Sequence, residues 1–246
     1  MSIAGKIAVV TGAAGAIGSA VSKSLVAEGA HVVLIDVASG PLALLSTELG
    51  SASTPVTLNL SDEAELKRVA ASLVSKFKCV DILVNGAGIL SNNKIAATTL
   101  EEWRHVNNVN VDAAFLLVQA LLPGMRAAKW GRIINISSYA AKSGGLTAGT
   151  AYSVSKSALI GLTFSIARET AHEGVTANAI APAYVMSSMI SEQLTEEQRK
   201  RQLEIIPVGR FCEPEEVAHT VAFLASPLAG FITGEVIDMN GGLHFD

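Results

Sequence analysis

The chain has 246 residues, of which 50% are apolar and 16% are charged. This composition supplies enough apolar side chains for a buried sheet and is not that of a disordered protein. The formal net charge of −4 and the absence of a long Lys or Arg run argue against a nucleic-acid-binding protein. The densest basic cluster, Arg199-Lys200-Arg201, follows Glu196 and Glu197 and is typical of a solvated helix face.

Several other classes of protein are disfavoured by what the sequence lacks. No stretch reaches the ~18 uninterrupted apolar residues that a membrane span needs, and residues 1–6 do not resemble a signal peptide. Cys79 and Cys212 lie far apart without a CxxC partner, and the five histidines show no metal-ligand spacing. We therefore expect a cytoplasmic protein with free thiols and no metal site, membrane partner or nucleic-acid partner.

Short apolar segments alternate with helical segments along the whole chain. Strands are expected over 6–11, 31–35, 56–58, 81–84, 132–136, 175–180 and 235–239. Helices are expected from the Gly-rich turn to about 28, and over 41–49, 62–77, 100–129 (interrupted near Pro123-Gly124), 150–172 and 214–225. This alternation predicts a parallel sheet covered on both faces. We predict a single α/β domain over residues 1–246, with a doubly wound Rossmann-type sheet of about seven strands.

Residues 183–207 break this alternation. A polar, charged stretch at 191–204 lies between apolar patches at 186–190 and 203–206. Such an insertion beside the strand ends predicts a mobile lid of short helices over a substrate. An ordinary pair of surface helices is the alternative.

A Gly-rich turn follows the first strand, with Gly12, Gly15 and Gly18 before an apolar helix. Glycines at this place let the backbone approach a pyrophosphate, whose charge is met by N–H groups at the helix N-terminus. Asp36 closes the second strand, where a carboxylate accepts hydrogen bonds from ribose hydroxyls and repels a 2′-phosphate. Neither Gly15 nor Val37 supplies a positive charge for that phosphate. The pattern favours NAD over NADP, although a solvated aspartate at a strand end is also common.

Tyr152 and Lys156 lie four residues apart in an expected helix, which places both on one face. A lysine ammonium ~4 Å from a phenol, at an effective dielectric of ~20, favours the phenolate by up to ~4 kcal/mol. That would lower the tyrosine pKa from ~10 toward the range of a general acid/base. Ser138 ends the preceding strand and can donate to a substrate oxygen. Taken alone, the Tyr-x-x-x-Lys pair is equally compatible with a surface helix.

Seven short motifs in order resemble the single-domain short-chain dehydrogenase/reductase family over about residues 5–242. They are TGAAGAIG (11–18), NGAG (85–88), VNV (109–111), ISS (136–138), YSVSK (152–156), IAPAYVMS (180–187) and TGEVIDMNGG (233–242). The resemblance extends to members that act as 3-oxoacyl-carrier-protein reductases. It implies a nicotinamide-dependent oxidoreductase.

The resemblance also implies roles for four catalytic residues. Tyr152 is expected to be the acid/base, and Lys156 to lower the tyrosine pKa and hold the nicotinamide ribose. Ser138 is expected to polarise the carbonyl. Asn110 is expected to hold a water in a proton relay behind the lysine. The spacing between Ser138 and Tyr152 is one residue longer than usual in the family, which leaves Ser137 as an alternative serine.

Cofactor contacts follow from the same resemblance. Asn59 and Leu60 are expected near the adenine, Asn85 on the adenosine side, and Val185 and Ser187 at the nicotinamide carboxamide. The expected cofactor-binding residues are Gly12, Gly15, Ile17, Gly18, Asp36, Asn59, Leu60, Asn85, Tyr152, Lys156, Val185 and Ser187. Several residues depart from the family pattern. Ala16 replaces the middle glycine of the first motif, Gly86 stands where a second Asn is usual, and Asn59 where Asp is frequent. Ala183 and Ser187 replace a usual Gly and Thr.

The expected substrate pocket is mainly apolar, with Leu90, Tyr139, Leu146, Tyr184 and Met189 in its walls. The leading prediction is therefore an NAD-dependent enzyme that interconverts a medium-sized secondary alcohol and a ketone. A 3-oxoacyl-carrier-protein reductase is the first alternative, but its acidic partner would need a basic docking face. Arg126, Lys129 and Arg168 are accompanied by Glu169 and Glu173, so that face is not clearly cationic. A non-catalytic NAD-sensing protein is the second alternative.

The run 113–122 is too apolar for a helix with one wet face, which indicates burial against a partner subunit. Together with the resemblance, this predicts a homotetramer.

Overall fold

The computed structural model describes residues 2–187 and 195–245. Its seven strands form one parallel sheet in the order β3-β2-β1-β4-β5-β6-β7. The strands are β1 (Ile7–Thr11), β2 (His31–Asp36), β3 (Ser53–Thr57), β4 (Ile82–Asn85), β5 (Gly131–Ile136), β6 (Val175–Pro182) and β7 (Val236–Met239). The order reverses between β1 and β4, and the carboxyl ends of these two strands therefore border a crevice.

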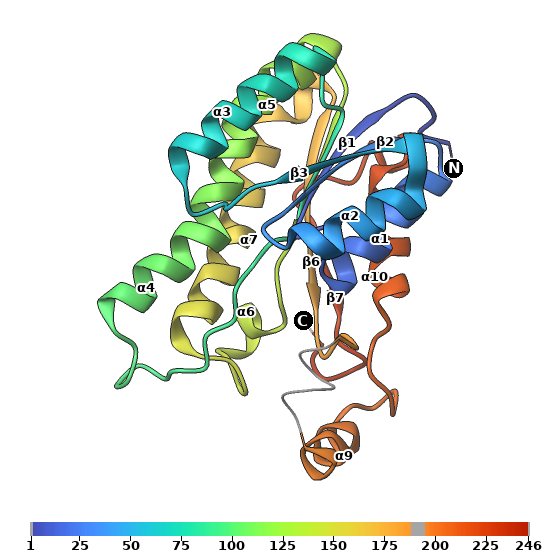
Figure 1. The fold of residues 1–246 in the computed structure, drawn as a ribbon. Helices are drawn as coiled ribbons and strands as arrows, with labels where there is room; N and C mark the ends of the chain where they lie inside the picture. The colour runs from blue at the N-terminus through green and yellow to red at the C-terminus, as the bar shows by residue number, and fades with distance from the viewer. Residues whose placement is uncertain (1, 188–194, 246) are drawn as a thin grey trace.

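Helices cover both faces of the sheet. They are α1 (Ala16–Ala27), α2 (Ser39–Leu49), α3 (Glu63–Phe77), α4 (Leu100–Asn107), α5 (Ala113–Ala128), α6 (Ala140–Ser143), α7 (Thr150–Thr170), α9 (Glu196–Ile205) and α10 (Pro214–Ala225). Figure 1 shows α3, α5 and α7 on one face and α1, α2 and α10 on the other. Each helix layer shares an apolar core with the sheet. The predicted doubly wound α/β fold is confirmed.

Local sequence signals explain where several helices begin. The Asp62 side chain accepts a hydrogen bond from the Glu65 N–H at 2.9 Å, and the Thr99 hydroxyl accepts one from the Glu102 N–H at 3.1 Å. These contacts cap the orphan donors of α3 and α4. At α10, Pro214 occupies the first turn, where its missing N–H costs nothing.

The long helical stretch was predicted to break near Pro123-Gly124, and that prediction is wrong. Pro123 lies inside α5, and the irregularity is a π-helical turn at Asn108–Asp112 between α4 and α5. A proline removes one hydrogen bond to the carbonyl four residues earlier. That carbonyl belongs to Gln119, which is exposed. Water can therefore hydrogen-bond to the carbonyl, and the helix continues.

By length and mean hydropathy alone, the run Leu100–Ala128 could cross a membrane. In this structure one side of its second half packs against the sheet instead. Leu117, Leu121 and Met125 are fully buried in the same core cluster as α3 and β5 residues. This run is thus a core helix of the α/β fold.

The third strand also differs from its expected bounds, since β3 spans Ser53–Thr57 rather than 56–58. It is one of the two edge strands, and its polar residues and Pro55 give no apolar pattern to find. The four-residue α6 was not predicted because it is too short to show a helical period.

The expected lid segment 183–207 contains α9. Figure 1 shows α9 and α6 at the same end of the molecule, beyond the carboxyl ends of the strands. Residues 188–194, which include the expected pocket residue Met189, lie outside the described residues. The mobility of the segment stays a prediction.

Candidate active site

A cavity of about 810 Å³ lies at the carboxyl ends of the central strands. Its walls come from the β1–α1 turn, the ends of β4 and β5, the loop before α7, α7 itself, the segment after β6, and α9. Segments far apart in the chain thus meet where the strand order reverses. The cavity is the candidate active site.

The β1–α1 turn forms one wall, with Gly12, Gly15 and Gly18 along it. Gly12 has a φ of +70°, and a Cβ there would lie 2.9 Å from the Ala87 backbone. A Cβ on Gly18 would lie 2.0 Å from the Gly12 oxygen. No side chain caps the N-terminus of α1, whose first residues line the cavity. Open N–H groups and a close backbone fit the pyrophosphate of a dinucleotide.

Asp36 lies at the end of β2, beside this turn. Its two carboxylate oxygens accept from the N–H groups of Ala14 at 3.0 Å and Ala38 at 2.9 Å. These bonds fix the carboxylate against the Gly-rich turn and leave lone pairs for a ribose hydroxyl. Residues 12–18 and 36–41 contain no Lys or Arg.

Asp36 itself is not among the residues that line the cavity, and neither are the other expected adenosine contacts. The Asn59 amide oxygen already accepts from the N–H and hydroxyl of Ser61, at 3.0 and 2.8 Å. The Leu60 side chain is buried in the core. Asn85 is also buried, and its amide donates to the Asn135 side chain at 2.8 Å, which ties β4 to β5.

Tyr152 and Lys156 both line the cavity from α7, and Ser138 joins them from the end of β5. Ser138 hydrogen-bonds the Tyr152 hydroxyl. The Lys156 ammonium lies 5.8 Å from the centre of the Tyr152 ring and donates to the Ile136 carbonyl at 2.8 Å. The three side chains therefore form one cluster.

The structure also separates the two adjacent serines. The Ser137 hydroxyl is buried and donates to the Lys156 carbonyl at 2.8 Å. Ser138 is the serine that contacts Tyr152. The geometry thus favours Ser138 over Ser137 as the group that meets a substrate oxygen.

Burial dominates the titration of this cluster. It lowers the pKa of Lys156 from 10.5 to about 8, because the ammonium is removed from water. Burial also raises the pKa of Tyr152, and the hydrogen bond from Ser138 lowers it. The sequence predicted a lowered tyrosine pKa from a lysine ~4 Å away. In this structure burial outweighs that effect, and the phenol is kept in its neutral form.

Asn110 lies in the π-helical turn and is 1% exposed. Its amide oxygen accepts from the Ile89 N–H at 2.8 Å, and its amide nitrogen donates to the Ile89 carbonyl and the Ser155 hydroxyl. A Cβ on Gly88 would lie 3.1 Å from the Lys156 ammonium. Asn110 thereby holds the 88–89 backbone against the lysine.

Val185 and Ser187, the expected carboxamide contacts, both line the cavity. The residues on either side of Val185 bond Cys212: Met186 donates to its carbonyl at 2.8 Å, and the Tyr184 carbonyl accepts from its N–H at 3.1 Å. Because neighbouring residues of an extended strand alternate, the backbone groups of Val185 point away from Cys212. In the described part of the chain, no other backbone group bonds them.

Four of the five expected substrate-pocket residues line the cavity: Leu90, Tyr139, Leu146 and Tyr184. The cavity is also lined by polar residues that were not named individually from the sequence: Asn92, Ser143, Thr147, Arg201 and Gln202. These residues belong to no motif, and only the fold brings them to one cavity.

Sequence reasoning also missed Lys94. Its ammonium donates to the Gly145 carbonyl at 2.5 Å and the Ala148 carbonyl at 2.7 Å. A neighbouring backbone bond joins the Gly149 N–H to the Ser91 carbonyl. These contacts hold the loop before α7, which forms the outer wall of the cavity.

In the part of the chain that the structure describes, no cluster of three or more His, Cys, Asp or Glu side chains is placed to hold a metal ion.

Comparison with known proteins gives consistent matches. A family model described as "Enoyl-(Acyl carrier protein) reductase" matches residues 12–244. The chain is 39% identical to the 3-oxoacyl-[acyl-carrier-protein] reductase FabG of Vibrio cholerae over 245 residues, with 99% of both chains covered. It is 38% identical to the enzyme of the same name from Escherichia coli, with the same coverage.

Two solved structures have the same fold with a TM-score of 0.92. One is a putative NAD(P)-dependent gluconate 5-dehydrogenase from Beutenbergia cavernae with NADP bound at low occupancy; it is 36% identical, and 98% of each chain is covered. The other is a putative gluconate dehydrogenase from Agrobacterium tumefaciens, 27% identical, with 98% of this chain and 97% of that one covered. Over nearly its whole length, then, the chain belongs to the short-chain dehydrogenase/reductase family of nicotinamide-dependent oxidoreductases.

Proposed function

We propose that this chain is an NAD-dependent oxidoreductase that interconverts a secondary alcohol and a ketone. The observation that carries the proposal is the cluster of Ser138, Tyr152 and Lys156 in a cavity that also contains the open N-terminus of α1. Binding a dinucleotide needs the helix N-terminus but neither the serine nor the tyrosine. A non-catalytic NAD sensor, the second alternative, would therefore leave these two residues without a purpose.

The chain's own residues handle the substrate oxygen and its proton. When bound, the nicotinamide accepts the hydride that leaves the alcohol carbon or returns it to the ketone. Oxidation needs the ionised form of Tyr152: once its phenol has lost a proton to solvent, the Tyr152 oxygen takes the hydroxyl proton, and Ser138 donates a hydrogen bond to the substrate oxygen as charge develops on it. In reduction the neutral phenol, which burial favours, protonates that oxygen. Lys156 supplies a positive charge beside the Tyr152 ring in both directions of the reaction.

The cofactor preference rests on Asp36. Its carboxylate is fixed by Ala14 and Ala38, and the adjoining segments 12–18 and 36–41 carry no cation to offset it. A 2′-phosphate would therefore meet uncompensated negative charge. The relative from Beutenbergia cavernae was solved with NADP, so the preference needs a direct test in this chain.

A 3-oxoacyl-carrier-protein reductase is the second candidate, because curated relatives of that name match the chain along its length. An acidic carrier protein would need a basic docking face. Arg126 contacts Glu169 and Glu173, each at 2.6 Å, so its charge is already neutralised. This contact disfavours carrier docking at the end of α5.

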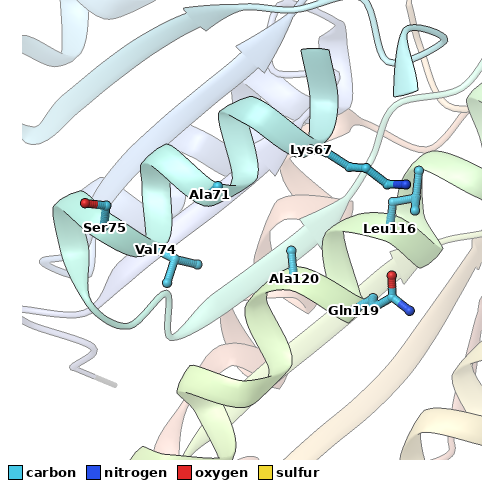
Figure 2. A pocket seen from close by; sticks show the side chains of 7 residues that line it. All are labelled: Lys67, Ala71, Val74, Ser75, Leu116, Gln119 and Ala120. Atoms are coloured by element: carbon cyan, nitrogen blue, oxygen red, sulfur yellow. The ribbon is translucent and has the colours of Figure 1, made fainter. Parts of the chain in front are cut away.

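We also infer a homotetramer, in the cytoplasm of the cell. Phe115 and Phe164 are each 48% exposed on α5 and α7. A hollow of about 420 Å³ is lined by residues of α3 and α5, among them Val74, Leu116 and Ala120. Figure 2 shows these side chains on the two helices. A second exposed apolar group, Leu228 and Phe231, follows α10. Two separate apolar faces fit two different two-fold interfaces, which together form a tetramer.

Replacing Tyr152 with Phe should lower kcat at least 100-fold and leave NADH binding unchanged, because only the proton donor and acceptor is lost. Steady-state kinetics and NADH fluorescence titration measure the two effects. Tyr139→Phe, which makes the same substitution elsewhere in the same cavity, is the control. Its kcat should stay within about threefold of the wild-type value. A Tyr152→Phe enzyme that keeps more than a tenth of wild-type turnover would show that another group is the acid/base.

The wild-type enzyme should have at least a tenfold higher kcat/KM with NAD than with NADP. Asp36→Asn should reduce that ratio by about tenfold or more, because it removes the charge that repels the 2′-phosphate. Glu48→Gln, on the exposed side of α2, removes an equal charge and should leave the ratio unchanged. A wild-type preference for NADP would overturn the cofactor proposal.

Lys156→Met should raise the free energy of unfolding of the cofactor-free protein at pH 7 by about 1–3 kcal/mol while abolishing activity. The folded-state pKa of about 8 lies below the ordinary value of 10.5, so the buried charge destabilises the fold fully below pH 8. This cost disappears as the pH rises toward 10.5, and the variant's advantage should disappear with it. Urea unfolding at pH 7 and pH 10 measures both; Lys67→Met, at an exposed lysine, should change stability by less than about 0.5 kcal/mol at either pH. Equal stability of wild type and Lys156→Met at pH 7 would argue against a depressed lysine pKa.

Light scattering at micromolar concentration should give about 102 kDa, the mass of four chains of 25.5 kDa each. Phe231→Glu should yield a smaller species, because it places a charge in one of the two proposed interfaces. Leu44→Glu, at an exposed apolar residue on α2, should leave the mass unchanged. A monomer for the wild-type protein would remove the proposal.

A further inference from the structure

The sequence predicted a mainly apolar pocket, but charged side chains also line the cavity. Among the described residues that line it, only Lys156 and Arg201 carry a formal charge, and none of them is an Asp or Glu. Both charges are positive. Lys156 lies among the catalytic residues, whereas Arg201 belongs to α9 at the outer side of the cavity. A ligand that spans the two positions is favoured if it carries a negative group at its outer end.

Arg201 is suited to exchange its present partner for a ligand. Its Nη2 atom contacts the Glu197 carboxylate at 2.6 Å, and the two side chains are 74% and 75% exposed. Exposed pairs of this kind contribute little to stability, so competition by another carboxylate costs little. A guanidinium has five N–H donors in a fixed fork, which matches a carboxylate through two parallel hydrogen bonds.

Gln202 gives a second, independent indication. Its side-chain oxygen is buried and has no hydrogen-bond partner in the described structure, although the residue lines the cavity. A buried polar atom without a partner is costly, and a ligand hydroxyl would satisfy it. Further hydrogen-bonding side chains line the same cavity: Asn92, Ser143 and Thr147. This lining suits a carbon chain that bears several hydroxyls.

We propose that the substrate is a polyhydroxy acid whose carboxylate pairs with Arg201 and one of whose hydroxyls donates to Gln202. The inference rests on the proposed function, since the reacting secondary alcohol of the same molecule lies at Ser138 and Tyr152. Arg201 is thus assigned as a specificity-determining residue. Leu90 and Leu146, which also line the cavity, contact the carbon skeleton.

Gluconate and sorbitol form a matched pair of probes, because they share a hydroxylated six-carbon chain and differ in a carboxylate at one end. The wild-type enzyme with NAD should show at least a tenfold higher kcat/KM for gluconate. Arg201→Gln should lower kcat/KM for gluconate by about 10–100-fold, the range expected for a charged hydrogen bond, and change that for sorbitol by less than threefold. Arg201→Lys keeps the positive charge but loses the forked pair of N–H donors. Its kcat/KM for gluconate should lie between those of the wild type and Arg201→Gln.

Lys200→Gln is the control, because Lys200 is an exposed neighbour on α9 outside the cavity lining. Its kcat/KM values for gluconate and for sorbitol should both stay within about twofold of those of the wild type. A second readout titrates gluconate into the enzyme–NADH complex and follows NADH fluorescence. The affinity for gluconate should fall in Arg201→Gln by the same factor as kcat/KM, and it should be unchanged in Lys200→Gln.

Three results would overturn the inference: equal efficiency for gluconate and sorbitol, equal effects of Arg201→Gln and Lys200→Gln, or no binding and no turnover of gluconate. The proposed function is tested separately by uncharged secondary alcohols and 3-oxoacyl thioesters. Turnover of either class that depends on Tyr152, with none of gluconate, would refute the polyhydroxy acid and keep the oxidoreductase. Failure to bind NADH would refute both.

Discussion

A lysine ammonium buried at the carboxyl edge of the sheet is the constraint on which the candidate site depends. Burial of an ion is unfavourable unless hydrogen-bond partners replace water. Lys156 is 4% exposed, and its ammonium donates to the Ile136 carbonyl where β5 ends. The Ser137 hydroxyl returns a bond from that strand end to the Lys156 carbonyl. The same contacts therefore satisfy the charge and fix α7 against β5, which places Tyr152 beside Ser138.

The π-helical turn between α4 and α5 serves the same constraint. A π turn is rare and is typical of functional sites. Here it places the Asn110 amide where it bonds both backbone groups of Ile89 and the Ser155 hydroxyl. This closes the wall above Lys156, where Gly88 leaves room for the ammonium and a side chain would not. The irregular backbone is thus explained by the packing that the buried lysine requires.

The sequence predicted the parts of the fold whose signals are local. The bounds of α10 were predicted in full, because a proline opens the helix and an apolar period runs through it. Pro123 was misjudged because its effect depends on whether water reaches one carbonyl, which only the packing of α5 decides. The predicted roles of Tyr152 and Lys156 came from their spacing together with the family resemblance. The predicted direction of the tyrosine pKa was wrong, because burial is a property of the folded chain. Arg201 was predicted on a solvated face, and it is exposed, but its place at the cavity depends on where α9 lies.

Catalytic and specificity residues are positioned by different parts of the fold. The groups proposed to handle the proton lie on α7 and just after β5, two elements that pack in the core. Arg201 lies on α9, and the outer wall includes a loop held by Lys94. The outer elements make few of the buried contacts that stabilise the sheet, so their side chains can change at little cost to folding. Relatives of similar fold carry the names of an acyl-carrier-protein reductase and of gluconate dehydrogenases, with identities as low as 27% at a TM-score of 0.92. A rigid catalytic layer beneath a replaceable outer wall accounts for such a spread of substrates. We therefore expect the substrate preference of this chain to depend on α9 rather than on the Tyr-x-x-x-Lys motif.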